Sequence, residues 1–424
     1  MSHNSVKLEN GLRVVTVELP YLHSVELAVY IKAGSRNDPW KRSGLSHFLE
    51  HMLFRGTEDY ASALEIETAF EELGGSVNAA TDADSTCYYA RIHPAHVEQG
   101  LSILASMLLR PKLEGIELER GIIGEEALED INESGVITNP DLVMGNLLWP
   151  GHPLGCATVG SLEDIKLITD SDLRNHLFNW YSPANAVVVV SGPVVAASVA
   201  TAVNRHFGGW QMRPVPPTLV APAGVCDGPA AAFVQDADSQ VTVQLAFHSY
   251  RRDDPRITPL KVLRRILAGG GCSRLHLALR ERLGLVYAVD SAIGAYDETG
   301  CITIDFSTAP ENLPKVLSAT LNELHLLMTE TAPERELERV RTAYLADLDY
   351  SRDSVSEMCA RYGWGTLMQV VRSIDEDQKL VSEVTPELLA KTAQELFRAD
   401  NRFMAVIGPV GGIDQQETLK MLRT

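Results

Sequence analysis

Three residues whose side chains can bind metal or transfer protons stand close together near the start of the chain: His47, Glu50 and His51. Their spacing, H-x-x-E-H, is the zinc motif H-E-x-x-H written in reverse. On an α-helix, residues i and i+4 lie one above the other, so His47 and His51 can offer two imidazoles to one metal ion. Glu50 precedes the second histidine, where its carboxylate can reach a water on the metal without being a ligand. The motif therefore predicts a metal centre that activates water.

The neighbouring residues favour a helix that presents this motif on its polar side. Apolar residues recur at the helical spacing i, i+3, i+4, i+7 and i+8, and they are Leu45, Phe48, Leu49, Met52 and Leu53. At about 100° per residue, the histidines and the glutamate fall on the opposite side of this helix. We therefore expect them to belong to a site and not to the core.

The motif supplies only two metal ligands, whereas a catalytic zinc usually has three protein ligands and a water. The natural source of the third is the carboxylate-rich segment 114–132, which we expect to be a long helix. Glu119 and Glu126 are seven residues apart and share one helical face. Three other glutamates of this segment compete with them as the third ligand: Glu117, Glu125 and Glu129. Periodicity alone does not choose among the five.

A zinc ion with such ligands lowers the pKa of its water to about 7. Glu50 can then take the proton of this water as general base and return it to a leaving amine. These groups suit attack on an unactivated carbonyl, which makes peptide hydrolysis the leading reaction class.

Length and composition limit the kinds of protein that this chain can be. Its 424 residues point to two or more domains, and its net charge of −19 argues against nucleic acid and anionic membranes as partners. No apolar run reaches the roughly 18 residues that span a bilayer, and the first residues do not show the basic and apolar regions of a secretory signal. Six cysteines without a C-x-x-C pair are typical of reduced thiols. We therefore expect a cytoplasmic protein.

The first half mixes strand and helix patterns without strict alternation. Strands are expected at 5–19 with a hairpin turn at Asn10-Gly11, and at 25–32, 76–80, 86–92 and 185–194. Helices are expected at 62–73, 96–109, 114–132, from 141 onward, within 162–180 and at 195–207. Strands joined by hairpins, with helices between them, are typical of the α+β class.

The second half repeats the first. Residues 401–410 match residues 185–194 at a displacement of 216, and residues 385–389 match 169–173 at the same displacement. A shared displacement implies an internal duplication of about 210 residues. The proline-rich stretch after residue 212 favours an extended connection. We predict a catalytic zinc-binding domain at 1–212, a linker at 213–230 and a homologous domain at 231–424, of which only the first contains H-x-x-E-H.

These segments resemble the pitrilysin/insulinase family of zinc peptidases over nearly the whole chain. Residues 44–57 are similar to the family's catalytic helix, and E-R-G-I-I-G-E-E at 119–126 is similar to its second motif. The resemblance implies that Glu126 is the third zinc ligand and that Glu119 supports the site. G-G-S-V-N-A-A-T at 74–81 resembles the family's substrate-binding edge strand, in which Asn78 and Ala79 would pair with peptide backbone.

The second half carries a further resemblance at 269–287, where Arg280 and Tyr287 match a pair that the family brings over the zinc. A guanidinium and a phenol there can hold substrate and stabilise the oxyanion. The resemblance also implies two homologous α+β halves that close as a clamshell around a chamber, with one zinc per chain. Because one chain carries both residue sets, a homodimer or an active monomer is favoured over an obligate heterodimer of homologous subunits, and the homodimer is the leading expectation.

The sequence therefore predicts a zinc endopeptidase that encloses short unstructured peptides. One alternative is a non-catalytic scaffold subunit of the same fold. Another is a dedicated maturation peptidase for a presequence or for the peptide precursor of a cofactor. The presence of every motif residue favours catalysis over scaffolding.

Overall fold

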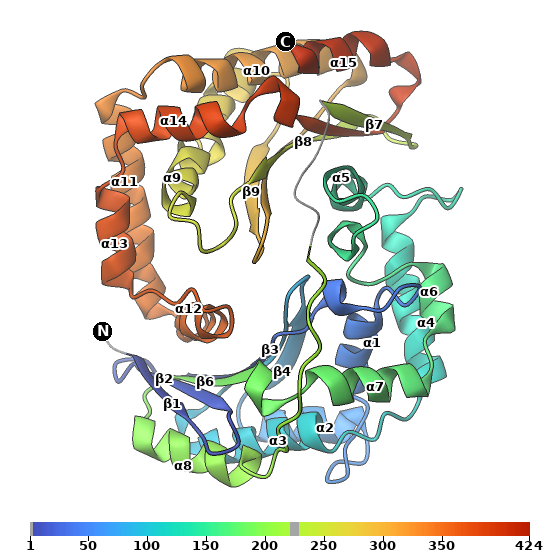
Figure 1. The fold of residues 1–424 in the computed structure, drawn as a ribbon, viewed down its shortest axis with the longest axis vertical. Helices are drawn as coiled ribbons and strands as arrows, with labels where there is room; N and C mark the ends of the chain where they lie inside the picture. The colour runs from blue at the N-terminus through green and yellow to red at the C-terminus, as the bar shows by residue number, and fades with distance from the viewer. Residues whose placement is uncertain (1–2, 221–228) are drawn as a thin grey trace. The chain divides into compact units, whose positions relative to one another are not determined.

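The computed structural model describes residues 3–220 and 229–424, which form two compact units that each draw on both halves of the chain (Figure 1). The first unit contains the described residues up to Leu128, together with Cys156–Leu219 and Leu348–Ile374. The second contains Glu129–Gly155, the described residues from Val220 to Asp347, and Asp375–Thr424. The predicted contiguous domains 1–212 and 231–424 place Glu129–Gly155 in the first domain and Leu348–Ile374 in the second, whereas in the structure each of these two segments belongs to the other unit. Within the predicted linker, residues 221–228 lie outside the described residues.

A six-stranded sheet forms the centre of the first unit. Its order is β1 (His3–Lys7), β2 (Arg13–Glu18), β6 (Ala186–Gly192), β3 (Val25–Ile31), β5 (Thr86–Ile92) and β4 (Ser76–Thr81). Only β2 and β6 pair in parallel, and the other neighbours are antiparallel. The central strands β3 and β6 are buried along their whole length, whereas β4 lies at an edge of the sheet.

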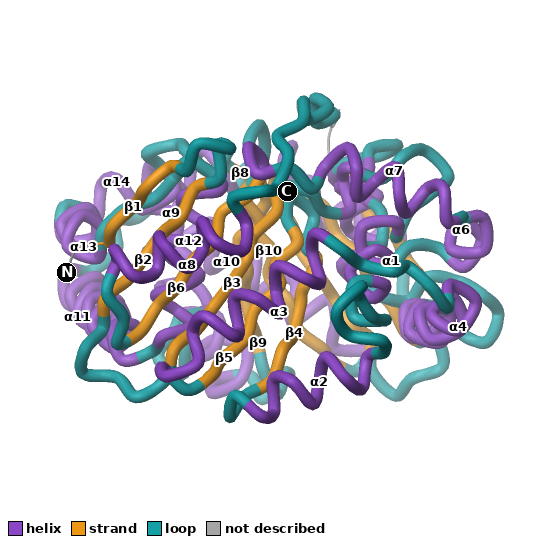
Figure 2. Tube along the Cα trace, turned by 90° about the horizontal axis from the view of Figure 1, so that it is seen from below, coloured by secondary structure: helices purple, strands orange, loops and turns teal. Residues whose placement is uncertain are grey.

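Helices cover both faces of this sheet. α3 (Val97–Leu109) and α8 (Ala196–Phe207) cross one face (Figure 2). The opposite face packs against α12 (Val355–Leu367), which comes from the second half of the sequence. α12 approaches closely because Gly363 has no side chain: a Cβ there would lie 2.5 Å from Val189 and 2.6 Å from Tyr30. The remaining helices of this unit are α1 (Leu45–Met52), α2 (Ala63–Glu72), α4 (Ile116–Ala127), α6 (Leu162–Leu167) and α7 (Asp170–Trp180).

The second unit has a five-stranded sheet with the same pairing pattern. Its order is β7 (Ala230–Gln235), β11 (Phe403–Gly408), β8 (Val241–Ser249), β10 (Gly300–Thr308) and β9 (Val289–Ala295), with only β7 and β11 parallel. α5 (Pro140–Leu148), from the first half of the sequence, packs against β11, β8 and β7. Its other α-helices are α9 (Ile257–Ala268), α10 (Leu313–Thr329), α11 (Glu334–Tyr350), α13 (Ile374–Ser382), α14 (Pro386–Leu396) and α15 (Gln415–Arg423).

Equivalent hydrogen bonds in the two units confirm the duplicated α+β architecture. The amide of Asn185 donates to the carbonyl of Lys32 at 3.0 Å, and the amide of Asn401 donates to that of His248, also at 3.0 Å. Both residues of the second pair stand 216 positions after those of the first.

α1 and α9 also end 216 positions apart, at Met52 and Ala268. At the positions that correspond to the H-x-x-E-H motif, α9 carries Leu263, Ile266 and Leu267, and each of them is 0% exposed. In the second copy of the duplicated unit, the helix face that corresponds to the H-x-x-E-H motif is therefore part of the core.

Three further points concern the predictions from the sequence. The helix expected at 114–132 is shorter, because α4 ends at Ala127 and a 3₁₀ turn follows where the chain passes from the first unit to the second. The five cysteines within the described residues have no disulfide partner. No helix among the described residues is both long enough and apolar enough to cross a membrane.

Candidate metal centre

Helix α1 is fixed at its start by the carboxylate of Asp38. Asp38 accepts hydrogen bonds from the main-chain N–H of Gly44 at 2.8 Å and of Ser46 at 2.9 Å, and from the Ser46 hydroxyl at 2.6 Å. Gly44 is in the left-handed region, with φ of 88°, and a Cβ there would lie 2.2 Å from the carbonyl of Val159. Burial raises the pKa of Asp38 to about 7, although its hydrogen bonds act in the opposite direction. These contacts set the direction in which α1 leaves the loop.

The predicted apolar stripe of α1 forms part of the core of the first unit, with all five residues at most 1% exposed. On the other side, Ser46 contacts Nε2 of His176 on α7 at 3.1 Å. Burial lowers the pKa of His176 to about 3, so its imidazole is neutral. Packing on one face and hydrogen bonding on another therefore fix the rotation of α1.

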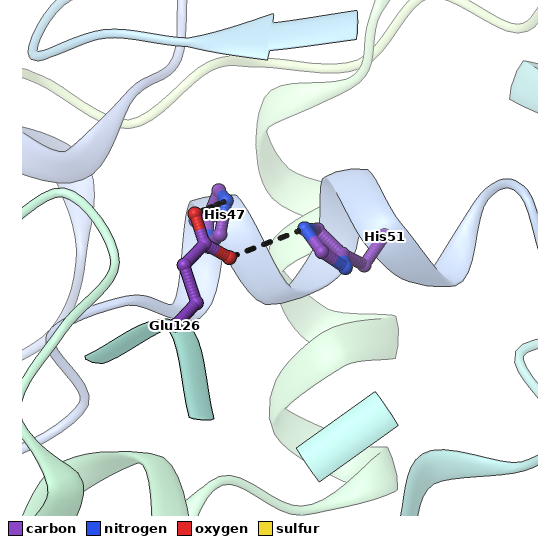
Figure 3. Close-up of side chains that lie close together, drawn as sticks. All are labelled: His47, His51 and Glu126. Carbon is purple, nitrogen blue, oxygen red and sulfur yellow. Dashed lines mark ion pairs between the residues drawn. The ribbon is translucent and has the colours of Figure 1, made fainter. Parts of the chain in front are cut away.

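His47, His51 and Glu126 converge in the structure (Figure 3). Their ligand atoms lie within 4.8 Å of one another, and no second such group of three occurs among the residues that the structure describes. Nε2 of His47 lies 3.7 Å from Glu126 Oε1, and Nε2 of His51 lies 3.9 Å from Glu126 Oε2. Glu126 comes from α4, so two helices form the cluster.

The donors fit a zinc ion. Ligand atoms about 2.1 Å from a tetrahedral zinc are roughly 3.4 Å apart. The distances from the Glu126 oxygens to Nε2 of His47 and of His51, 3.7 and 3.9 Å, therefore need to shorten by only a few tenths of an ångström. Burial lowers the pKa of His47 to about 4, which leaves a neutral imidazole that can act as a ligand. Two imidazoles and one carboxylate are a donor set that zinc accepts.

Glu119 contacts the cluster from the side away from Glu126. Its Oε2 lies 3.4 Å from Nδ1 of His51, and its Oε1 lies 3.2 Å from Nη1 of Arg55. The side chain of Glu119 is only 7% exposed. Nδ1 of His51 faces the carboxylate of Glu119, so the other ring nitrogen, Nε2, faces Glu126. The sequence analysis did not identify Arg55 as a partner of Glu119. The local pattern that could have indicated it is a cation four residues after His51.

Glu50 lies beside the cluster and is not one of its three donors. It is 8% exposed, and the hydroxyl of Thr81 donates a 2.5 Å hydrogen bond to its Oε2. Burial raises the pKa of Glu50, the hydrogen bond from Thr81 lowers it, and the charges of His51 and Glu126 also act on it. Thr81, too, was missed from the sequence, because a threonine at the end of a strand has no distinctive local pattern.

The other predicted site residues lie in two places. Asn78 and Ala79 are on the edge strand β4, where Asn78 is exposed and Ala79 is half-buried. Arg280 and Tyr287 lie together in the second unit, with the guanidinium carbon 5.3 Å from the tyrosine ring centroid. Tyr287 is 84% exposed, so it is not a core residue. Arg280 belongs to a π-helix, His276–Arg282, a rare form that is frequent at functional sites. The proposed roles of these four residues stay predictions.

The fold and the cluster together define a class of protein: two related α+β halves, of which one carries the H-x-x-E-H motif with a glutamate from a second helix beside it. The family model described as Insulinase (Peptidase family M16) matches residues 13–144, and that described as Peptidase M16 inactive domain matches residues 168–344. The chain belongs to this family. The resemblance inferred from the motifs is confirmed.

Relatives and solved structures agree with this membership. The chain is 30% identical to an uncharacterized zinc protease of Mycobacterium bovis, over 95% of this chain and 92% of the relative. It is also 30% identical to the uncharacterized zinc protease YmxG of Bacillus subtilis, over 96% and 98% of the two chains. The crystal structure of a protease from Helicobacter pylori has the same fold, with a TM-score of 0.87 and 23% identity over 96% of this chain and 99% of that one.

Proposed function

We propose that the protein is a zinc-dependent endopeptidase. The observation that carries this proposal is the convergence of His47, His51 and Glu126, with the buried carboxylate of Glu50 beside them. The names of the relatives, as zinc proteases, support zinc as the metal. The apolar residues of α9 and the description of the second domain as inactive support a single catalytic centre per chain.

In the proposed reaction, His47, His51 and Glu126 hold one zinc ion. Bound there, zinc would acidify a water molecule and polarise the peptide carbonyl. Glu50 accepts the proton of the attacking water and delivers it to the nitrogen of the departing amine. Burial supports this second step, because a carboxyl whose pKa is raised holds a proton more readily than one in water.

The proposed substrate is a short peptide that can adopt an extended conformation. The free edge of β4 supports this class, because an edge strand offers unpaired main-chain groups to a peptide. We further propose that Asn78 and Ala79 lie along the bound peptide, and that Arg280 and Tyr287 hold it and stabilise the oxyanion. Enclosure of the peptide in a chamber between the halves, and assembly as a homodimer, belong to the same proposal.

The test is digestion of a library of unfolded peptides by the purified protein, with products identified by mass spectrometry and zinc measured on the same sample. We expect about one zinc per chain and cleavage within peptides. Glu50→Gln should keep its zinc while kcat falls by about 10²–10⁴-fold. Glu72→Gln, at an exposed position at the end of α2, is the matched control and should behave as wild type.

Two results would reject the proposal. One is protein that contains no zinc when it is purified without chelators. The other is full activity in Glu50→Gln. A chain that binds zinc, fails to cleave any peptide and copurifies with a larger complex would instead support the scaffold alternative.

A further inference from the structure

We propose that Thr81 is a positioning residue that fixes the general base Glu50 and ties it to the strand on which the substrate lies. This inference rests on the proposed function and extends it to a residue outside the motif. Thr81 is the last residue of β4, and its hydroxyl lies 2.5 Å from Oε2 of Glu50. A contact this short to a buried carboxylate is typical of a charge-assisted hydrogen bond.

The direction of this hydrogen bond follows from the neighbouring groups. Thr81 Oγ1 also lies 3.3 Å from Thr86 Oγ1, and either hydroxyl could be the donor there. However, the hydroxyl of Thr86 donates to the carbonyl of Ala33 at 2.9 Å. An ionised Glu50 can only accept, so the proton of Thr81 points to Glu50. The base is thus held by a hydroxyl whose own position is fixed by the β4–β5 pairing.

The pairing of β4 with β5 shows which main-chain groups face the free edge. Beyond the end of both strands, the N–H of Asp82 donates to the carbonyl of Ser85 at 2.8 Å. In an antiparallel pair, hydrogen-bonded and non-hydrogen-bonded positions alternate. The pair Thr81–Thr86 is therefore non-hydrogen-bonded, and so is the pair that contains Ala79.

It follows that Thr81 and Ala79 point their main-chain groups away from β5, whereas Asn78 points its groups toward β5. A peptide that extends the sheet would pair with the main chain of Ala79, two residues before Thr81, whose hydroxyl binds Glu50. Thr81 thus holds Glu50 at a fixed distance along β4 from Ala79, the nearest residue whose main chain can pair with a peptide.

Thr81→Val and Thr81→Ser test this role. Valine keeps the size and the β-branched shape of threonine but has no donor, whereas serine keeps the hydroxyl. We expect Thr81→Val to lower kcat for an unfolded peptide at least about tenfold, with KM changed less than about threefold because Ala79 still pairs with the peptide. Thr81→Ser should recover most of the wild-type kcat. The zinc affinity of both variants should equal that of wild type.

Thr86→Val is the control for a purely structural effect. It removes the other hydroxyl of the pair but leaves the donor to Glu50 in place. We expect it to lower the melting temperature without a selective loss of kcat. Equal losses of kcat in Thr81→Val and Thr86→Val, in step with their melting temperatures, would show that Thr81 only stabilises the hairpin.

Crystal structures of zinc-free wild type and Thr81→Val give a second measurement that does not depend on activity. We expect the carboxylate of Glu50 to leave its position, or to occupy several rotamers, in the variant. An unchanged Glu50 in both structures, or wild-type kcat in Thr81→Val, overturns the role of Thr81. An inactive wild-type protein rejects the proposed function instead, and the two structures still decide whether Thr81 fixes Glu50.

Discussion

Replacement of Glu119 should weaken zinc binding although Glu119 is not among the three converging ligands. Its carboxylate faces Nδ1 of His51 at 3.4 Å and is 7% exposed. A histidine that donates its second nitrogen to a carboxylate is held in the correct tautomer and is a stronger ligand. The substitutions Glu119→Gln and Glu119→Ala remove this support in two steps.

The size of each step follows from the kind of hydrogen bond that is lost. A hydrogen bond to a charged group contributes about 1.5–3 kcal/mol, and one between neutral groups contributes about 0.5–1.5 kcal/mol. Glutamine keeps an oxygen that His51 can reach, so Glu119→Gln should lose about 1–1.5 kcal/mol, which is roughly five- to tenfold in zinc affinity. Alanine keeps no acceptor, so Glu119→Ala should lose roughly 10–100-fold.

The assay is competition for zinc with a chromophoric chelator, at a pH where the histidines are neutral. Glu125→Gln is the matched control, because it removes the same charge from an exposed position next to Glu126, the proposed ligand. Arg55→Gln should fall between the control and Glu119→Gln, since Arg55 acts on the zinc only through Glu119. Equal affinities for Glu119→Ala and Glu125→Gln would refute the reasoning, because the carboxylate beside His51 would then have no effect on the metal.

Three further predictions concern the second unit, the pH dependence and the core. Tyr287→Phe should lower kcat for peptide cleavage by about 10²-fold with unchanged zinc affinity, and loss of zinc would show that Tyr287 lies in the coordination shell. His176 has a folded-state pKa of about 3, so the stability that it contributes is present above about pH 6.5 and decreases below that pH. Between about pH 7.5 and pH 5, the free energy of unfolding should fall by about 2 kcal/mol more in wild type than in His176→Gln, as measured by urea unfolding of zinc-free protein. Parallel curves would contradict this. Phe48→Ala, at a position that is 0% exposed, should cost about 3–5 kcal/mol of stability by the same measurement, and a smaller loss would mean that the core collapses around the gap.

Local patterns predicted the parts of the molecule that depend on periodicity. The apolar stripe of α1, the hairpin at Asn10-Gly11 and the strands of the first sheet follow from the alternation or helical spacing of side chains. Spacing also pointed to one carboxylate-rich helix as the source of the carboxylate that lies beside the two histidines. It did not separate Glu119 from Glu126, because both lie on the face that meets α1, and only the distances show which of them reaches both Nε2 atoms.

Contacts between distant segments gave no such signal. Arg55 is an ordinary cation in the sequence, and it has a role only because α4 places Glu119 within 3.2 Å of it. Thr81 is likewise one strand residue among many, until the hairpin brings its hydroxyl to Glu50. The exchange of α5 and α12 between the units depends on which sheet face each helix covers, and an amphipathic pattern does not name its partner.

Because each unit contains a helix from the other half of the chain, neither half of the sequence supplies a complete unit. A fragment that ends at the proline-rich connection keeps all six strands of the first sheet but lacks α12, so the face around Tyr30 and Val189 loses its cover. The complementary fragment lacks α5 in the same way. A protease that cuts between the halves would therefore leave two fragments that stay associated through α5 and α12. For the same reason, truncation at the connection would not yield a complete copy of the duplicated unit.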